Sequence, residues 1–368
     1  MYPTEHALKN AWHGASGDEI LPINNCHIAV IGVGGAGNNT VSRLMETGIV
    51  GAECIAINTD SIHLGASKAN KKVLIGEKLT KGLGVGGDPK LGRAAIEESK
   101  KRVEELLSDV NIAFITAGLG GGTGTGAAPI IAEIARRKGA ITVGVVTTPF
   151  RIEKGRMEYA AAALTEMRRQ CDTVVVIDNN KLMHLVPQLP INEAFRIADQ
   201  VLVNMIKGIV ETISASSLIN LDFADFRTIV RKGGVAVVGV GESDAPDRAE
   251  EAVRNALRSP LLDVDYIGAT GALIHVIGDN RMSIEEANRV GEIVTEMMDN
   301  NALVIWGARV NPELDGKLKV TLVMTGVNSP HILSGFGTIA PQLFNLEPHA
   351  EPERPLDLKL DLYQMENF

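Results

Sequence analysis

The chain has 368 residues, of which 45% are hydrophobic and 4% aromatic, and its formal net charge is −9. This length is enough for two domains with hydrophobic cores, and the acidic balance argues against nucleic acid as a partner. No apolar run reaches the roughly 18 residues of a membrane-spanning helix, so we expect no direct membrane insertion. Cys26, Cys54 and Cys171 form no disulfide or zinc pattern, which favours a reduced, cytoplasmic setting.

Residues 1–25 are polar and charged and are expected to form an N-terminal extension. From Cys26 to Ile177, short β-rich runs then alternate with helical patterns. Apolar strands separated by helices predict a doubly wound α/β domain, over 26–190, whose parallel sheet is covered on both faces. Its ligand is expected beyond the carboxyl ends of the strands. The expected strands are His27–Ile31, Glu53–Ile57, Lys72–Ile75, Ile112–Thr116, Ile141–Thr147 and Thr173–Ile177.

A long helical pattern from about Asn192 to Ile213 predicts a spine helix over 191–215, followed by a second, smaller α/β domain over 216–327. Prolines and acidic residues beyond Val327 predict a mostly disordered tail over 328–368. Its alternating end, Leu356–Tyr363, could add a strand to a partner's sheet, and a frayed end without function is an equal alternative. The second domain's expected strands are Ala236–Val240, Ala272–Ile277, Leu303–Val310 and Lys317–Met324, and its helices Asp247–Leu257 and Ile284–Met298.

The most informative segment is a run of five glycines and two threonines between an apolar strand and a helical pattern that begins at Ala127. Glycine lets the backbone turn through positive φ and approach a ligand closely, and the helix behind the run adds its positive end. We therefore expect a phosphate-binding loop rather than a flexible linker. The run consists of Gly120, Gly121, Gly122, Thr123, Gly124, Thr125 and Gly126.

Two further glycine-rich loops accompany this run. The first strand ends in a glycine-rich turn at Gly32, which fits a dinucleotide-binding loop, and Asp60 supplies the acidic residue that such a site needs after the second strand. That pattern alone would suit a nicotinamide-dependent oxidoreductase. Another loop precedes a helix that begins at Pro89. Three such loops suit a chain of phosphates better than one pyrophosphate, and the GxxxxGK[ST] pattern of a P-loop NTPase is absent from the sequence.

The GGGTGTG run resembles the signature loop of the tubulin/FtsZ superfamily of filament-forming GTPases, and the resemblance covers about residues 25 to 327. It implies a GTPase with the tubulin/FtsZ fold that uses GTP/GDP and Mg²⁺, with metal ligands unknown. It also implies contacts to the α- and β-phosphates and the guanine edge from Gly34, Gly35, Asn38 and Asn39. The γ-phosphate contacts would come from Gly84, Gly86 and Gly87, and the main phosphate cradle from residues 120–126.

The resemblance assigns the remaining nucleotide contacts to the loops after the fifth and sixth strands. Glu153 is implied to bind the ribose, and Arg156 follows it by three residues where family members usually have four. The resemblance implies that this arginine contacts the ribose or a phosphate. The other implied contacts are Thr147, Pro149 and Asn179.

Phe195 and Asp199 lie four residues apart on the spine helix and so share one face. Phe195 can stack on a purine, and Asp199 can accept hydrogen bonds from the N1–H and exocyclic amine of guanine, which adenine cannot offer together. A buried carboxylate left unpaired by adenine would be a strong discriminator. The alternative is an ordinary core phenylalanine beside a solvated aspartate.

Three polar residues follow the spine helix: Asn220, Asp222 and Asp225. Asp222 on its own could simply cap the next helix. A helix of some twenty residues spans about 30 Å, so these side chains cannot easily reach their own nucleotide. The resemblance implies that they act on the γ-phosphate of the next subunit in a head-to-tail homopolymer, where they position the attacking water.

The resemblance therefore implies a GTP-dependent filament protein of the cell-division ring, located in the cytoplasm at mid-cell. A membrane-anchoring adaptor is expected to bind the tail, although the tail holds no close copy of the bacterial DxPxF-type peptide. The chain is expected to be an archaeal member. The alternatives are a paralogue that shapes cells or segregates plasmids, a monomeric GTP-binding switch, and the nicotinamide-dependent oxidoreductase.

Overall fold

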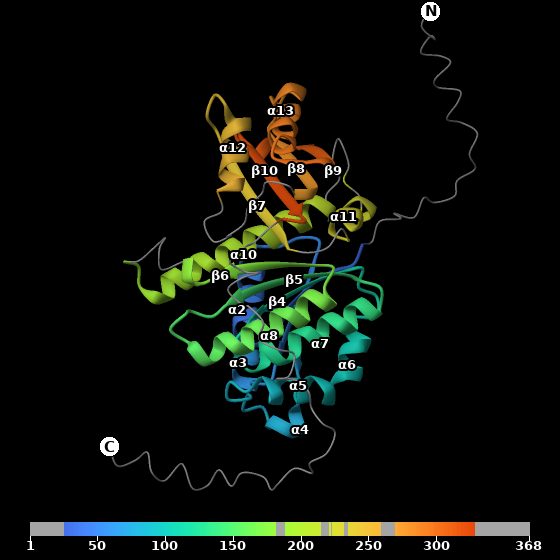
Figure 1. Ribbon diagram of the computed structural model, residues 1–368, viewed down its shortest axis with the longest axis vertical. Helices are drawn as coiled ribbons and strands as arrows, with labels where there is room; N and C mark the ends of the chain where they lie inside the picture. The colour runs from blue at the N-terminus through green and yellow to red at the C-terminus, as the bar shows by residue number, and fades with distance from the viewer. Residues whose placement is uncertain are drawn as a thin grey trace, which may run out of the picture.

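The computed structural model describes residues 26–181, 188–214, 221, 223–231, 235–258 and 269–327. Two sheets lie toward opposite ends of the long axis, and helix α10 (Ile191–Ser214) runs between them (Figure 1). Within the described ranges, no helix combines the length and apolar character needed to cross a membrane.

The larger sheet has six parallel strands in the order β3-β2-β1-β4-β5-β6. The chain therefore winds outward twice from the centre, and the order reverses between β1 and β4, where doubly wound sheets open a ligand crevice. This confirms the predicted fold class. The strands are β1 (Ile28–Val33), β2 (Glu53–Asn58), β3 (Lys71–Leu74), β4 (Ile112–Gly118), β5 (Ile141–Thr148) and β6 (Thr173–Asp178).

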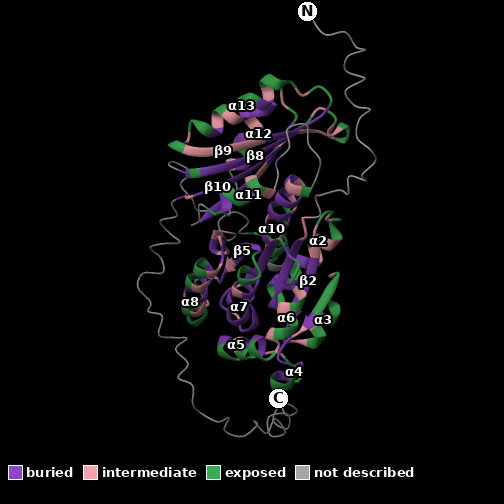
Figure 2. Ribbon diagram, turned by 90° about the vertical axis from the view of Figure 1, so that its right-hand side faces the viewer, coloured by how far each residue is buried: buried purple, intermediate pink, exposed green. Residues whose placement is uncertain are grey.

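Helices cover both faces of this sheet, so its strands are buried on two sides (Figure 2). Along β1, Ile28 and Val30 face one core with α2 and α10, whereas Ala29, Ile31 and Val33 face the other with α5, α6, α7 and α8. This is why the strands appear in the sequence as continuous apolar runs. The helices are α2 (Gly34–Glu46), α3 (Ser61–Ala66), α4 (Glu77–Thr80), α5 (Pro89–Glu98), α6 (Lys100–Leu106), α7 (Thr123–Arg137) and α8 (Lys154–Gln170).

Two helices begin earlier than the glycine-rich sequence indicates. α7 starts at Thr123 instead of Ala127, and α2 starts at Gly34, so four of the seven residues of the GGGTGTG run and all of 34–39 are helical. Tertiary packing overrides the low helix propensity of glycine here. A Cβ on Gly126 would lie 2.1 Å from the carbonyl oxygen of Pro89, and only glycine permits this approach of α7 to α5.

The smaller sheet has the order β7-β10-β8-β9, with β10 antiparallel to both neighbours and β8 parallel to β9. The prediction that the second helix of this domain runs to Met298 is wrong, because α13 ends at Thr295. Met298 instead begins β9, where it pairs with Ala269 ahead of a register shift. Polar residues 299–301 hide this start in the sequence. The elements are α11 (Phe223–Val230), β7 (Ala236–Ser243), α12 (Arg248–Leu257), β8 (Ala269–Gly278), α13 (Ile284–Thr295), β9 (Met298–Val310), η1 (Pro312–Leu314) and β10 (Leu318–Thr325).

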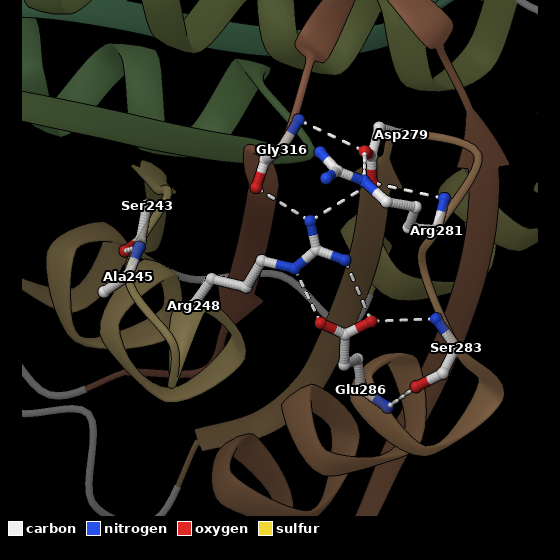
Figure 3. A network of polar contacts seen from close by, with 8 residues as sticks. All are labelled: Ser243, Ala245, Arg248, Asp279, Arg281, Ser283, Glu286 and Gly316. Atoms are coloured by element: carbon white, nitrogen blue, oxygen red, sulfur yellow. Dashed lines mark hydrogen bonds and ion pairs between the residues drawn. The ribbon is translucent and has the colours of Figure 1, made fainter.

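A buried arginine ties the elements of this second domain together (Figure 3). Arg248 at the start of α12 donates to Glu286 Oε1 at 2.6 Å, to Asp279 Oδ1 at 3.1 Å and to the carbonyl of Gly316 at 2.7 Å. The Arg281 guanidinium first, and Arg248 with it, lower the pKa of Asp279 to about 2. The network joins α12, α13 and the turns that flank β8 and β10.

Candidate nucleotide-binding site

A cavity of about 560 Å³ lies beyond β1 and β4, where the strand order reverses, and it adjoins a second cavity of about 550 Å³. The two share lining residues that include Gly35, Thr147, Asn179 and Phe195. Together they bring residues from seven separate segments to one place. The sequence-predicted residues that line them are Gly35, Asn39, Gly84, Gly86, Gly87, Gly121, Gly122, Thr123, Gly124, Thr147, Pro149, Glu153, Arg156, Asn179, Phe195 and Asp199.

The N-termini of α2 and α7 border the larger cavity without a side-chain cap. Their N-cap residues, Val33 and Gly122, accept no side-chain hydrogen bond from the helix, whereas Asp60 and Asp88 cap the neighbouring α3 and α5. The first N–H groups of α2 and α7 therefore lack a side-chain acceptor. Two uncapped helix starts, with their aligned dipoles, make a site for an anion.

The loop between α4 and α5 forms another wall. Gly84, Gly86 and Gly87 have φ values of +81°, +57° and +83°, which few other residues adopt. A Cβ on Gly86 or Gly87 would meet nothing within 4 Å, so these backbones border open space, whereas a Cβ on Gly122 would lie 2.4 Å from Val85 Cγ2. The loop is thus packed against the start of α7 while its glycines face open space.

The segment after β5 is held by Glu153. This carboxylate accepts a hydrogen bond from the Phe150 N–H at 3.1 Å and forms an ion pair with Arg156. The shift of Arg156 to three residues after Glu153 allows this pairing within one helical turn. The arginine side chain remains 59% exposed.

The smaller cavity carries the side chains suited to a base. The rings of Phe195 and Phe150 meet edge to face at 5.7 Å, and Phe195 stays 39% exposed. Asp199 Oδ2 accepts from Arg43 Nε at 2.8 Å. Burial raises the pKa of Asp199, and the neighbouring Arg43 opposes that rise. Asn179 Oδ1 is buried and has no hydrogen-bond partner in the described part of the chain.

A nucleoside phosphate fits these residues. Buried polar groups are almost always paired, so the orphaned oxygen of Asn179 calls for a donor from a ligand. The glycine backbones leave room that a Cβ would fill, and the uncapped helix starts suit phosphates. The ring of Phe195 and the carboxylate of Asp199 supply a stacking face and acceptors for a base.

Two family models match this chain. The model described as "Tubulin/FtsZ family, GTPase domain" covers residues 27–187, and the model "FtsZ family, C-terminal domain" covers 234–328. "Cell division protein FtsZ 2" of Methanocaldococcus jannaschii is 55% identical over 83% of this chain and 81% of its own length. "Cell division protein FtsZ 1" of Pyrococcus furiosus is 52% identical, with 83% and 82% covered.

The chain belongs to the tubulin/FtsZ family. It is a GTPase that binds guanine nucleotide in the domain that carries both cavities. A solved FtsZ dimer from M. jannaschii is 48% identical, superposes with a TM-score of 0.76 and covers 89% of this chain and 93% of its own. CetZ1 from Haloferax volcanii, solved as a GDP-bound monomer, is 25% identical with a TM-score of 0.73, covering 84% and 97%. The relatives found are archaeal, as expected.

Five predicted contacts of this tubulin/FtsZ site lie behind the cavities instead of lining them. Asn38 is fully buried, and with its amide nitrogen toward Gly32 it donates to that carbonyl at 2.8 Å. Thr125 Oγ1 accepts from the Gly120 N–H at 2.8 Å, which closes the turn before α7. The five residues support the backbone that the ligand would touch, because each is turned toward a neighbouring segment. They are Gly34, Asn38, Gly120, Thr125 and Gly126.

Asp225, the predicted catalytic residue that the structure describes, stands apart from the cavities. Asn220 and Asp222 lie outside the described residues, and Asp225 is on α11, partly buried. α10 runs from the cavity at Phe195 to Ser214, which packs against Gly51 ahead of β2, at the edge opposite the strands' carboxyl ends. Its 24 residues span about 36 Å, so Asp225 is far from the chain's own cavity.

Sequence reasoning missed several lining residues. Thr59 and His63 follow β2, and Phe150 lies within a motif whose neighbours were assigned. Asp60 also lines the cavity, but it accepts from the N–H groups of Ile62 and His63 and so caps α3. Arg43 carries no sequence signal, since only the packing of α2 beside α10 brings it to Asp199. In the ranges that the structure describes, no three His, Cys, Asp or Glu residues are grouped as a metal site.

Proposed function

We propose that this chain is a subunit of a GTP-dependent filament in the cell-division ring, and that it hydrolyses GTP where one subunit meets the next. The observation that supports this proposal is the separation of the two cavities from Asp225. The cavities supply phosphate and base contacts in one chain, whereas Asp225 lies beyond the far end of α10. A head-to-tail stack brings the two surfaces together and does not close on itself, so it makes a filament.

Each part of the site then has a distinct task. The N–H groups at the starts of α2 and α7 hold the phosphates, while Phe195 and Asp199 hold the guanine. Asp225, with Asn220 and Asp222, reaches the γ-phosphate of the neighbouring subunit and orients the attacking water. The phosphate oxygens and water would hold most of the Mg²⁺ coordination shell, as Mg²⁺ commonly prefers, and the ion would neutralise charge on the phosphates.

Division is favoured over a role in cell shape by sequence similarity. Identity to the relatives named as cell division proteins is 55% and 52%. The monomeric switch is disfavoured by the distance of Asp225 from the cavity. The strand order alone would also suit an oxidoreductase, but the third glycine-rich loop and the family models do not. We place the protein in the cytoplasm at mid-cell, with an adaptor that links its tail to the membrane.

Sedimentation tests this function. With GTP and Mg²⁺ the purified chain should pellet as polymer, and with GDP it should stay in the supernatant. Asp225→Ala should bind GTP and pellet like the parent but release phosphate at least about tenfold more slowly, the loss expected for a group that orients a nucleophile. Arg93→Gln, at a half-buried position on α5 outside both cavities, serves as the control. Equal pelleting with both nucleotides, or full turnover by Asp225→Ala, would contradict the proposal.

A further inference from the structure

An ion pair crosses between two helices at the wall of the smaller cavity. Arg43 comes from α2 and Asp199 from α10, and both line the cavity beside Phe195. Arg43 Nε lies 2.8 Å from Asp199 Oδ2, and the two side chains are only 28% and 20% exposed. A partly buried pair of this kind is screened far less than a surface pair. The ion pair therefore fixes the orientation in which the Asp199 carboxylate meets a ligand in the cavity.

We propose that Arg43 is a positioning residue for guanine: it fixes the Asp199 carboxylate as a two-oxygen acceptor for the base. The inference rests on the proposed function, in which Asp199 reads guanine. The ion pair engages Oδ2 from one side. A carboxylate has about four lone-pair sites, so both oxygens still have capacity for the N1–H and exocyclic amine of the base.

The environment of Asp199 explains why a cation is needed there. Burial raises the pKa of this carboxyl, and Arg43 is the charged neighbour that lowers it. His63 on α3 also lines this cavity. Glu46 on α2 lies close enough to Arg43 and Arg196 to interact with both charges. A protonated carboxyl turns one acceptor oxygen into a donor. Without Arg43, a fraction of the protein would present the wrong face to guanine.

Arginine suits this task better than lysine. Its guanidinium stays charged at every physiological pH and its planar fork fixes the direction of the hydrogen bond. A lysine would restore the charge but hold the carboxylate less firmly. The alternative role for Arg43 is a simple tie between α2 and α10, with no influence on the base.

The chain offers a matched control for that alternative. Arg93 and Glu166 join α5 to α8 at 2.9 Å, with side chains 24% and 25% exposed, and neither lines a cavity. Arg43→Gln and Arg93→Gln therefore each remove one charge from an equally buried helix-to-helix pair. Glutamine keeps a hydrogen-bond donor in place, which limits the disturbance to folding.

The experiment measures the dissociation constants of GDP and IDP for the full chain at about pH 8 and pH 6. IDP keeps the N1–H donor and lacks the exocyclic amine. Arg43→Gln should weaken GDP about tenfold, the value of one charged hydrogen bond, and weaken IDP less. Its GDP affinity should fall further at the lower pH, while the parent and Arg93→Gln change little. Arg43→Lys should recover part of the preference for GDP over IDP.

Equal losses of GDP and IDP in Arg43→Gln, with the parent's pH profile, would show a tie between helices and overturn the inference. Asp199→Ala separates this failure from a failure of the proposed base contact. If Asp199→Ala loses the preference for GDP over IDP while Arg43→Gln keeps it, only the role of Arg43 is wrong. If Asp199→Ala also keeps the preference, Asp199 does not read guanine and both assignments fail.

Discussion

The glycines of the GGGTGTG run have different structural roles, which follow from the atoms around each of them. A Cβ on Gly121 would meet nothing within 4 Å, whereas on Gly126 it would lie 2.1 Å from the carbonyl oxygen of Pro89. Gly121 lines the larger cavity, and Gly126 lies where α7 crosses α5. One glycine leaves space for a ligand, and the other permits two helices to touch.

This difference predicts that the same substitution to alanine lowers stability at Gly126 and weakens nucleotide binding at Gly121. Gly126→Ala should lower the free energy of unfolding by about 1–3 kcal/mol, because the added methyl group overpacks a backbone contact. Gly121→Ala should leave stability nearly unchanged and weaken GTP binding about tenfold, or 1.4 kcal/mol. Urea unfolding and nucleotide titration measure the two effects.

Gly291→Ala, on α13 with open space around its Cβ position, is the control for both. Normal folding of Gly126→Ala would mean that α5 can move away at little cost. Normal GTP binding by Gly121→Ala would place the phosphates elsewhere in the cavity.

At this scale the sequence predicts the backbone of the site better than its side chains. The GGGTGTG run and the loop at Gly84 are local patterns with a direct physical meaning. The partner of Asp199 depends on two helices, 156 residues apart in the chain, packing side by side. Local patterns therefore indicated the glycine-rich backbone that lines the larger cavity and missed Arg43.

Among the elements, α10 has the central position because it packs against both sheets. On the side of the smaller sheet, Thr212 donates to the carbonyl of Gly208 at 2.7 Å and lies 2.9 Å from His275 Nδ1 on β8. The hydroxyl has only one hydrogen, so it accepts from Nδ1–H. His275 Nε2 is then left buried and without a partner in the described residues.

This histidine should make stability depend on pH. Burial, with Arg309 and Lys319 nearby, lowers the pKa of His275 to about 4. In the unfolded chain it protonates near its ordinary value of about 6.5. Between these values the unfolded state binds more protons than the folded state. The contribution of His275 to the free energy of unfolding is therefore fully present above pH 6.5 and is lost as the pH falls toward 4.

Between about pH 7.5 and pH 5 the expected loss from this group is about 2 kcal/mol. Urea unfolding at the two pH values should show that loss in the parent and a smaller one in His275→Gln. An unchanged slope in His275→Gln would assign the pH dependence to other groups.

The arrangement of elements follows largely from the sequence, because continuous apolar strands and helical repeats are strong signals. Boundaries were wrong where packing competes with propensity. The glycines that begin α2 and α7 looked like loop residues, and Asp299 and its polar neighbours concealed the start of β9. The same glycines shape the cavity, so the errors at α2 and α7 fall at the candidate site.

On the scale of the whole molecule, the nucleotide cavities and Asp225, the residue proposed for catalysis, lie on different surfaces. The cavities lie at the carboxyl ends of the strands, and Asp225 lies beyond the other end of α10. Neither surface is complete for hydrolysis by itself in the proposed mechanism. Activity should therefore depend on how many subunits are joined.

The most direct measurement is GTP turnover per subunit as a function of protein concentration, with Mg²⁺ present. The proposed mechanism predicts little turnover below a threshold concentration and a rise above it, since the site is completed between subunits. Turnover per subunit that is constant from far below that threshold would mean that one chain holds a complete site, and it would contradict the head-to-tail mechanism.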